Sequence, residues 1–254
     1  MQRSSQSHLG FNYDAIASGQ IPGKTVWSKV GYNSNVLDLS DLWTYGNGYT
    51  PPSAAMGMEV VSDSADDDSA GDGARTVKIY YLTDAFVEKT ETVTMDGTNV
   101  VATSAVDIYR INNFVVASVG VDGCNAGTIH LRHLTNTPIY SEIEPTYNKA
   151  RCIFYTVPIS KVLNITSITF GSTSHVENTT VKFMTRATFD NLSGTVLSSG
   201  FIMPYHELTT LDMSFAKDLE LFTRFPTGVD LKVSAVSDTY ASCSVALRGY
   251  LENV

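Results

Sequence analysis

ARTVKIYYLT, residues 74–83, is the stretch that indicates the fold most clearly. In an extended chain Val77 and Ile79 fall on one face, while Thr76 and Lys78 fall on the other. Alternation with a period of two is the signature of a half-buried β-strand. The stretch therefore predicts a strand with one face in an apolar core and the other towards water.

Working outward, similar short runs recur along the chain, separated by turn residues. An Asp96-Gly97 pair lies between two of them and predicts a β-hairpin. Only residues 205–222 could hold a helix of any length. The further runs expected to form strands are 58–62, 91–95, 98–103, 113–121, 127–134, 152–157, 162–170, 180–189, 194–203, 229–237 and 243–251.

About ten to twelve short strands at close intervals predict an all-β fold, an antiparallel β-sandwich of jelly-roll-like type. We expect an extended N-terminal arm over residues 1–50, which are rich in glycine and aromatic residues. A β-sandwich unit should follow over residues 51–160. Residues 161–254 form either a second sandwich unit or the completion of the same sandwich.

Composition narrows the functional classes. The 254 residues carry a formal net charge of -9, and 43% of them are hydrophobic, so a sizeable core can form. Nucleic-acid binding needs clustered Lys and Arg, which this chain lacks. The longest apolar stretch, residues 114–121, is far shorter than the ~20 residues of a membrane span. We therefore expect neither nucleic acid nor membrane as a partner.

The cysteines and the N-terminus point to synthesis in a reducing cytoplasm. Cys124, Cys152 and Cys243 are widely spaced and odd in number, which is unlike a disulfide framework. The first twenty residues lack the apolar core of a secretory signal.

An acidic loop, SDSADDDSAGDGA, is the most conspicuous candidate site. Carboxylates crowded into one loop attract hard cations such as calcium, so Asp63, Asp66, Asp68 and Asp72 are candidate ligands. The spacing does not fit an EF-hand, because Ala70 would take its fifth position. A solvated loop without metal is the alternative.

The aromatic residues of the N-terminal segment are candidate interface anchors. Trp27, Trp43 and Tyr45 could bury their rings against a neighbouring subunit, since aromatic side chains are enriched at interface cores. Equally, they could fill the core of this protein itself.

Catalytic motifs are missing from the sequence. It has no G-x-S-x-G elbow, no phosphate-binding loop and no dinucleotide-binding glycine pattern. The spacing of Cys124, His130 and His133 would place the two histidines on opposite faces of a strand, which is wrong for zinc. We therefore expect a protein that is not an enzyme and has no cofactor apart from the calcium considered above.

One block resembles virion proteins of tailed bacteriophages. Its recognisable parts are S-A-x-D-x-x-x-G-x-G-A-R-T-V at residues 64–77, E-T-V-T-x-x-G-T at 91–98, R-I-N at 110–112 and N-x-G-x-I at 125–129. YTVPISK at 155–161 and FPTGVDLKV at 225–233 are similar to later parts of such proteins. Arg75 and Arg110, which lie in these motifs, are expected to pair with local carboxylates.

The resemblance implies a non-enzymatic structural protein of the virion, with no catalytic residue to carry over. A capsid decoration or cement protein that stabilises the particle through oligomeric interfaces is the first expectation. A head-to-tail component, a tail or fibre component, and a host-glycan-binding β module on the virion surface are the alternatives. The expected partners are further copies of the chain, as a trimer or another homo-oligomer, and the major capsid or tail proteins.

Overall fold

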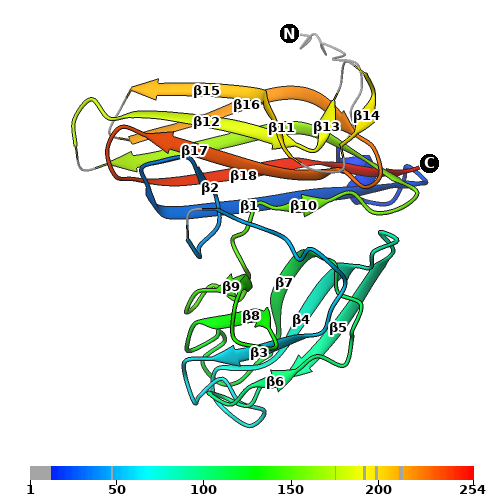
Figure 1. Cartoon of the computed structure of the whole chain (residues 1–254), viewed down its shortest axis with the longest axis vertical. Helices are drawn as coiled ribbons and strands as arrows, with labels where there is room; N and C mark the ends of the chain where they lie inside the picture. The colour runs from blue at the N-terminus through cyan, green and yellow to red at the C-terminus, as the bar shows by residue number, and fades with distance from the viewer. Residues whose placement is uncertain (1–12, 47, 175, 191–192, 198–199, 212–213) are drawn as a thin grey trace, which may run out of the picture.

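The structure, a computed structural model, describes residues 13–46, 48–174, 176–190, 193–197, 200–211 and 214–254. It is an all-β protein with several antiparallel sheets, which confirms the predicted class. Its strands form two units, one above the other in Figure 1. The large unit contains β1, β2 and β10 to β18, and the small unit contains β3 to β9.

Two sheets build the large unit. The first has the order β1-β18-β11-β16, and the second has the order β10-β17-β12-β15 with β2 also paired to β17. A separate hairpin joins β13 and β14. The bounds of these strands are β1 Lys24–Val36, β2 Ser40–Asp41, β10 Tyr155–Thr156, β11 Lys161–Ser174, β12 Thr180–Ala187, β13 Phe189–Asp190, β14 Thr195–Val196, β15 Ile202–Leu211, β16 Ser214–Phe225, β17 Asp230–Ser237 and β18 Ala241–Asn253.

The two large sheets share one apolar core. Alternate residues of β11, β12, β17 and β18 point into it, as period-two strands with one dry face require. Phe170 of β11 and Phe183 of β12 meet across the core with ring centroids 4.8 Å apart. The polar alternate residues, such as Ser244 and Arg248 of β18, remain outside.

The small unit has two sheets and a core of its own. One sheet has the order β6-β3-β8-β9 and the other β5-β4-β7. Val77 and Ile79, whose alternation predicted β4, are fully buried in this core. The bounds are β3 Met58–Ser62, β4 Ala74–Leu82, β5 Glu88–Thr94, β6 Val101–Ala102, β7 Arg110–Val119, β8 Ile129–His133 and β9 Ile139–Ile143.

The prediction of an extended arm over residues 1–50 is wrong for its second half. Residues 24–36 form β1, which pairs with β18 along almost its whole length. Trp27 faces the core and Gly31 lies tightly against Leu42 and Ile153, so this strand is part of the large unit. Residues 1–12 lie outside the described part of the chain.

Two further local expectations can be compared with the structure. The described residues between 205 and 222, where the sequence left room for a helix, belong to β15 and β16, which lie in different sheets. Asp96-Gly97 does not close a hairpin, because β5 pairs with β4 whereas β6 pairs with β3. Gly97 instead has a positive φ of 57° in a turn that carries the chain from one sheet to the other.

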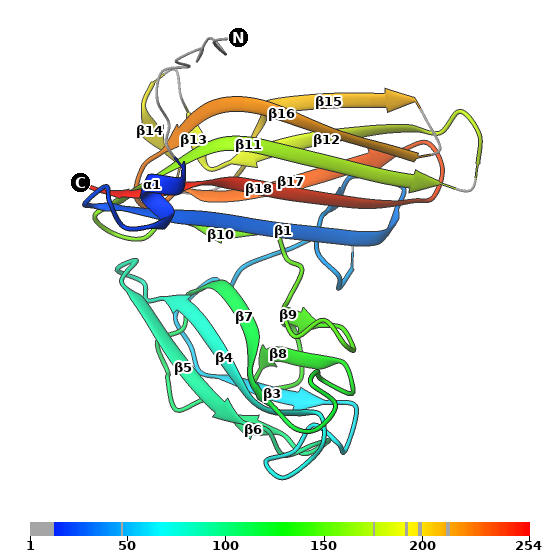
Figure 2. The ribbon, with the colours of Figure 1, turned by 180° about the vertical axis from the view of Figure 1, so that it is seen from behind.

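The only helix of the described residues is α1 (Tyr13–Ala17), which lies against β1 (Figure 2) and buries Ile16. No helix in this part of the chain has the length and apolar character needed to cross a membrane.

Candidate functional site

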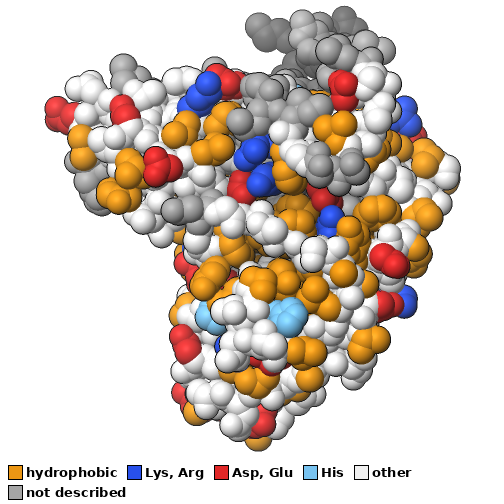
Figure 3. All heavy atoms as spheres, viewed as in Figure 1, with side chains coloured by type: hydrophobic (Ala, Val, Ile, Leu, Met, Phe, Trp, Pro, Cys, Tyr) orange, Lys and Arg blue, Asp and Glu red, His pale blue; other side chains and the backbone are white. Residues whose placement is uncertain are grey.

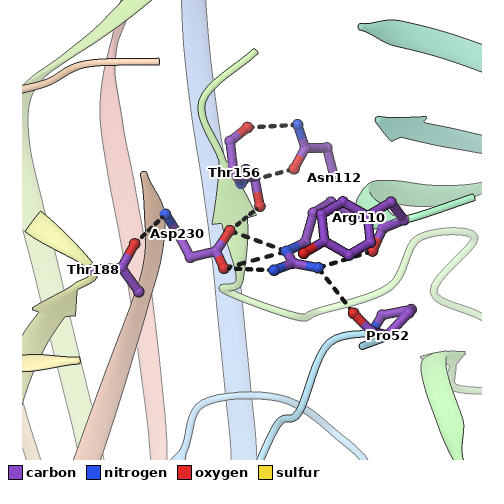
Figure 4. Close-up of polar contacts among 7 residues, drawn as sticks. Pro52, Arg110, Asn112, Thr156, Thr188 and Asp230 are labelled. Carbon is purple, nitrogen blue, oxygen red and sulfur yellow. Dashed lines mark hydrogen bonds and ion pairs between the residues drawn. The ribbon is translucent and has the colours of Figure 1, made fainter. Parts of the chain in front are cut away.

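The contact between the two units is an organised polar site. We call it the inter-unit junction and define it by Arg110, Asn112, Thr156 and Asp230 (Figure 4). Arg110 and Asn112 are two residues apart at the start of β7, so both project from the same face of that strand. Thr156 lies on β10 and Asp230 begins β17, both in the large unit.

Asn112 and Thr156 are joined by two hydrogen bonds. The Asn112 side-chain Nδ2 donates to the Thr156 carbonyl at 2.8 Å, and the Thr156 amide donates to Asn112 Oδ1 at 2.9 Å. The asparagine amide thereby imitates a neighbouring strand. Both residues are buried, so these bonds satisfy groups that water cannot reach.

Arg110 and Asp230 form an ion pair across the same contact, with side chains 12% and 10% exposed. Arg110 Nε lies 3.2 Å from each carboxylate oxygen of Asp230, and its Nη2 lies 3.2 Å from Oδ2. The Arg110 Nη1 donates to the carbonyls of Pro52 and Tyr109. Thr156 Oγ1 donates to Asp230 Oδ1 at 2.5 Å. Because both charges are paired and hydrogen-bonded, the pair fixes one orientation of the two units.

Lys29 of β1 adds a third link to the junction. Its ammonium donates to the backbone carbonyl of Asn112, and the residue is only 6% exposed. Burial lowers the pKa of Lys29 to about 8, since a charged ammonium is poorly solvated there. The large unit therefore holds a cation against a carbonyl of the small unit.

A cleft of about 600 Å³ opens beside the junction. Its wall combines aromatic residues with the ion pair, and both units contribute. The residues that line it include Phe86, Tyr109, Arg110, Thr188, Phe201 and Asp230.

The three predicted aromatic anchors lie in different surroundings in the structure. Trp27 is 7% exposed in the large core, and Trp43 is 4% exposed beside Tyr49. Neither tryptophan has the free area that an intermolecular anchor needs, so this prediction is wrong for both. Tyr45 is 41% exposed and meets Trp43 and His130 edge-on, at 5.6 and 5.9 Å between ring centroids.

The predicted calcium ligands do not converge. Asp63, Asp66 and Asp72 are exposed, and Asp68 uses Oδ1 to accept a bond from the Ala70 amide. Within the described ranges, no three His, Cys, Asp or Glu side chains are grouped so that they could hold a metal ion. Backbone hydrogen bonds from Gly71 to Asp68 and from Gly73 to Asp66 turn the loop back on itself, and Asp63 Oδ1 accepts a bond from the Thr128 amide.

Asp67, which we did not select as a ligand, is the organising residue of the acidic loop. It is fully buried and accepts hydrogen bonds from the amides of Ala74, Ala126 and Gly127, at 2.7 to 2.9 Å. Ser62 Oγ donates to it as well, at 2.6 Å. A single carboxylate thus ties the loop to the segment before β8.

Two glycines make this close approach possible. A Cβ at Gly73 would lie 2.3 Å from Asp67 Oδ1, and one at Gly127 would lie 2.2 Å from Asp63 Oδ1. Any side chain at either position would push a carboxylate away from the amides that it satisfies.

Sequence reasoning quoted several of these residues without finding their role. Asp67, Gly73 and Gly127 lie within the motifs that resemble phage proteins, as do Arg110, Asn112, Thr156 and Asp230. The expectation that Arg110 pairs locally is wrong, since its partner is 120 residues away. The sequence could have revealed the role of Lys29, because this cation lies on the same strand face as Trp27 and Gly31.

Comparisons with known proteins identify no family for this chain. No family model matches it, and no curated protein does. Among solved structures, it is weakly similar to the N-terminal CBM22-1-CBM22-2 tandem domain of Paenibacillus barcinonensis Xyn10C, with 11% identity, 91% of this chain and 94% of that chain covered, and a TM-score of 0.25. The D431N mutant VP2 protein of infectious bursal disease virus, in derived T=1 particles, gives 11% identity, 94% and 78% coverage, and a TM-score of 0.15. Likenesses this weak carry no conclusion about function.

Proposed function

We propose that this chain is a non-enzymatic structural protein of a tailed-phage virion, first of all a capsid decoration or cement protein. It would act by packing against its own copies and against capsid or tail neighbours. The jelly-roll-like sandwich expected from the sequence belongs to this proposal. The core shared by the two sheets of the large unit supports it.

The inter-unit junction is the observation that carries the proposal. Arg110 and Asp230 form hydrogen bonds across the contact between the two β units, and Asn112 and Thr156 do the same. Together these bonds hold the units in one orientation. A protein that bridges repeated neighbours needs surfaces at a constant angle, because every copy must make the same contacts. The motifs that resemble phage proteins supply these four residues.

Four titratable groups in or near the large unit and the junction fit a structural role. Burial raises the pKa of Cys243 to about 12 and also raises that of Cys152, so both thiols stay protonated. Lys29 is directed at a backbone carbonyl rather than into the cleft. The carboxylate that lines the cleft, Asp230, is already paired with Arg110. The protonated thiols, the ammonium bonded to a carbonyl and the paired carboxylate are thus all engaged within the fold.

Cryo-electron microscopy of the particle that contains this chain tests the proposal. We expect density for both units at a symmetric position on the shell, with the junction intact and copies in contact. Density at the neck or tail would favour the head-to-tail or fibre alternative. Purified particles without the chain would contradict a virion role altogether.

A further inference from the structure

Arg186 and Lys232 form an unusual pair of like charges. They are direct cross-strand partners on β12 and β17, so their side chains leave the sheet on the same face. Their side chains are only 17% and 10% exposed. Like charges directly opposite one another destabilise a sheet, and little water is present here to screen them.

One carboxylate compensates the two cations. Asp41 Oδ2 lies 2.8 Å from Lys232 Nζ, whereas Asp41 Oδ1 lies 3.9 Å from the nearest Arg186 nitrogen. Ser234 Oγ and the Tyr49 amide also donate to Asp41, so its oxygens are occupied. In the described part of the chain, the buried Arg186 Nε has no hydrogen-bond partner. Buried donors nearly always have one, so Asp41 and Ser234, which accepts from Arg186 Nη1 at 3.3 Å, leave the guanidinium incompletely satisfied.

This cation pair adjoins the cleft. Thr188, which directly follows β12, and Asp230, the first residue of β17, both line the cleft. Each is two residues from a member of the cation pair, which is about 7 Å along an extended chain. The ring of Phe201 connects the cleft with the cation pair. It lines the cleft, and its centroid lies 4.5 Å from Lys232 Nζ and 5.7 Å from Arg186 Cζ.

Figure 3 shows one face of the molecule, with side chains coloured by type. Lys and Arg side chains reach the surface in the middle of the molecule, beside acidic ones and above hydrophobic ones. A volume of about 600 Å³ is within the range of small-molecule sites, which combine apolar walls with a few polar groups.

We propose that this surface binds an acidic sugar, with its carboxylate between Arg186 and Lys232 and its ring in the cleft against Phe201. One excess positive charge matches a carboxylate monoanion, and the planar guanidinium is suited to it. Aromatic walls offer flat apolar faces to the C–H surface of a sugar ring. Thr188 and Thr227 offer hydroxyl groups to its polar edge. This binding site goes beyond the structural role proposed above.

Calorimetric titration of the full chain tests the proposal. The ligand is a galacturonate trisaccharide, and its methyl ester is the uncharged control ligand. We expect the acid to bind at least tenfold more tightly than the ester. Arg186→Gln should weaken binding of the acid at least tenfold and leave binding of the ester unchanged, because Lys232 still neutralises Asp41. Lys182→Gln is the matched control. Lys182 lies on the same strand, is exposed, and pairs with Glu207 at 2.7 Å, so its loss should change neither affinity.

Several results would overturn the assignment. Equal binding of acid and ester, or no binding of either at millimolar concentration, excludes a carboxylate site. Tighter binding of a glutamate-rich peptide than of the trisaccharide would assign the site to a protein partner instead. The acid–ester comparison uses the unaltered chain, so it decides the matter even if Arg186→Gln does not fold. Failure here would leave the virion role untouched, because that role is tested by the position of the chain in the particle.

Discussion

At the residue scale, single polar groups buried among apolar ones determine how the chain is held together. Asp67 and Lys29 are the two extremes in how fully hydrogen bonds compensate a buried charged group. Asp67 accepts four hydrogen bonds from its surroundings, whereas Lys29 reaches one carbonyl at the cost of burying an ammonium. The first residue is well compensated and the second only partly, so their substitutions should behave differently.

Asp67→Ala should lower the free energy of unfolding by at least about 3 kcal/mol, because three buried backbone amides lose their acceptor. Urea denaturation of the variant and the parent measures this difference. Asp66→Ala is the control, since Asp66 is exposed on the same loop, and its effect should stay within about 0.5 kcal/mol. Equal effects of the two substitutions would show that Asp67 does not organise the loop.

Lys29 should make stability rise with pH in the alkaline range. Its pKa is about 8 when folded and about 10.5 when unfolded, so between these values the unfolded chain binds more protons. Folding then becomes easier as pH increases, by about 3 kcal/mol over the whole window at 1.36 kcal/mol per pH unit. Below pH 8 the cost of burying the charge is constant.

Lys29→Met removes this contribution. Buried thiols and tyrosines change stability in the opposite sense at alkaline pH, so the quantity to measure is the difference between parent and variant. We expect that difference in unfolding free energy to move in favour of the parent between pH 8 and pH 10. A difference that stays constant over this range would contradict a lowered Lys29 pKa.

At the element scale, alternation predicts which face of a strand is buried but not which strand is its neighbour. Val77 and Ile79 were assigned correctly to the buried face because the period of two depends on local chain geometry alone. The pairing of β6 with β3 rather than with β5 depends on contacts made after the sheets assemble. For the same reason, the Asp96-Gly97 signal predicted a turn correctly and its hairpin wrongly.

The candidate site was harder to predict than the strands. Arg110 and Asp230 come from different units, and nothing within a few residues of either one indicates the other. Whether Trp27 and Trp43 lie in an external interface or in the core of the chain was left open, because aromatic residues suit cores and interfaces equally. Only the paired sheets show that these rings are already covered.

Arg110→Gln tests whether β7 is held to the large unit by the ion pair. Asp230 would remain buried without its cation, which should cost about 3 kcal/mol of unfolding free energy. Hydrogen exchange should become faster at Thr156 and in the first residues of β7. Lys89→Gln is the control, because it breaks an exposed pair with Asp107 in the same unit and should cost less than about 1 kcal/mol. Unchanged exchange at Thr156 in the Arg110 variant would show that the ion pair does not hold the units.

At the scale of the whole molecule, the edge strand β1 offers the large unit a surface for association. β1 is the last strand in the order of its sheet, and its outer face carries Val26 and Val30, which are 37% and 38% exposed. An exposed edge strand with apolar side chains is a template for pairing with another chain. We therefore expect copies of the chain to associate through this edge.

Val30→Glu should shift the protein from oligomer to monomer, because an ionised carboxylate would have to be buried at the contact. Sedimentation velocity over a range of protein concentrations measures the shift, and we expect dissociation at a concentration at least tenfold higher than for the parent. Val106→Glu is the control, since Val106 is 75% exposed on the small unit and away from β1. A parent chain that stays monomeric at all concentrations would exclude the β1 edge as a self-association surface. Equal dissociation of the two variants would assign the effect to net charge, because both substitutions add the same charge and only one of them lies on the edge.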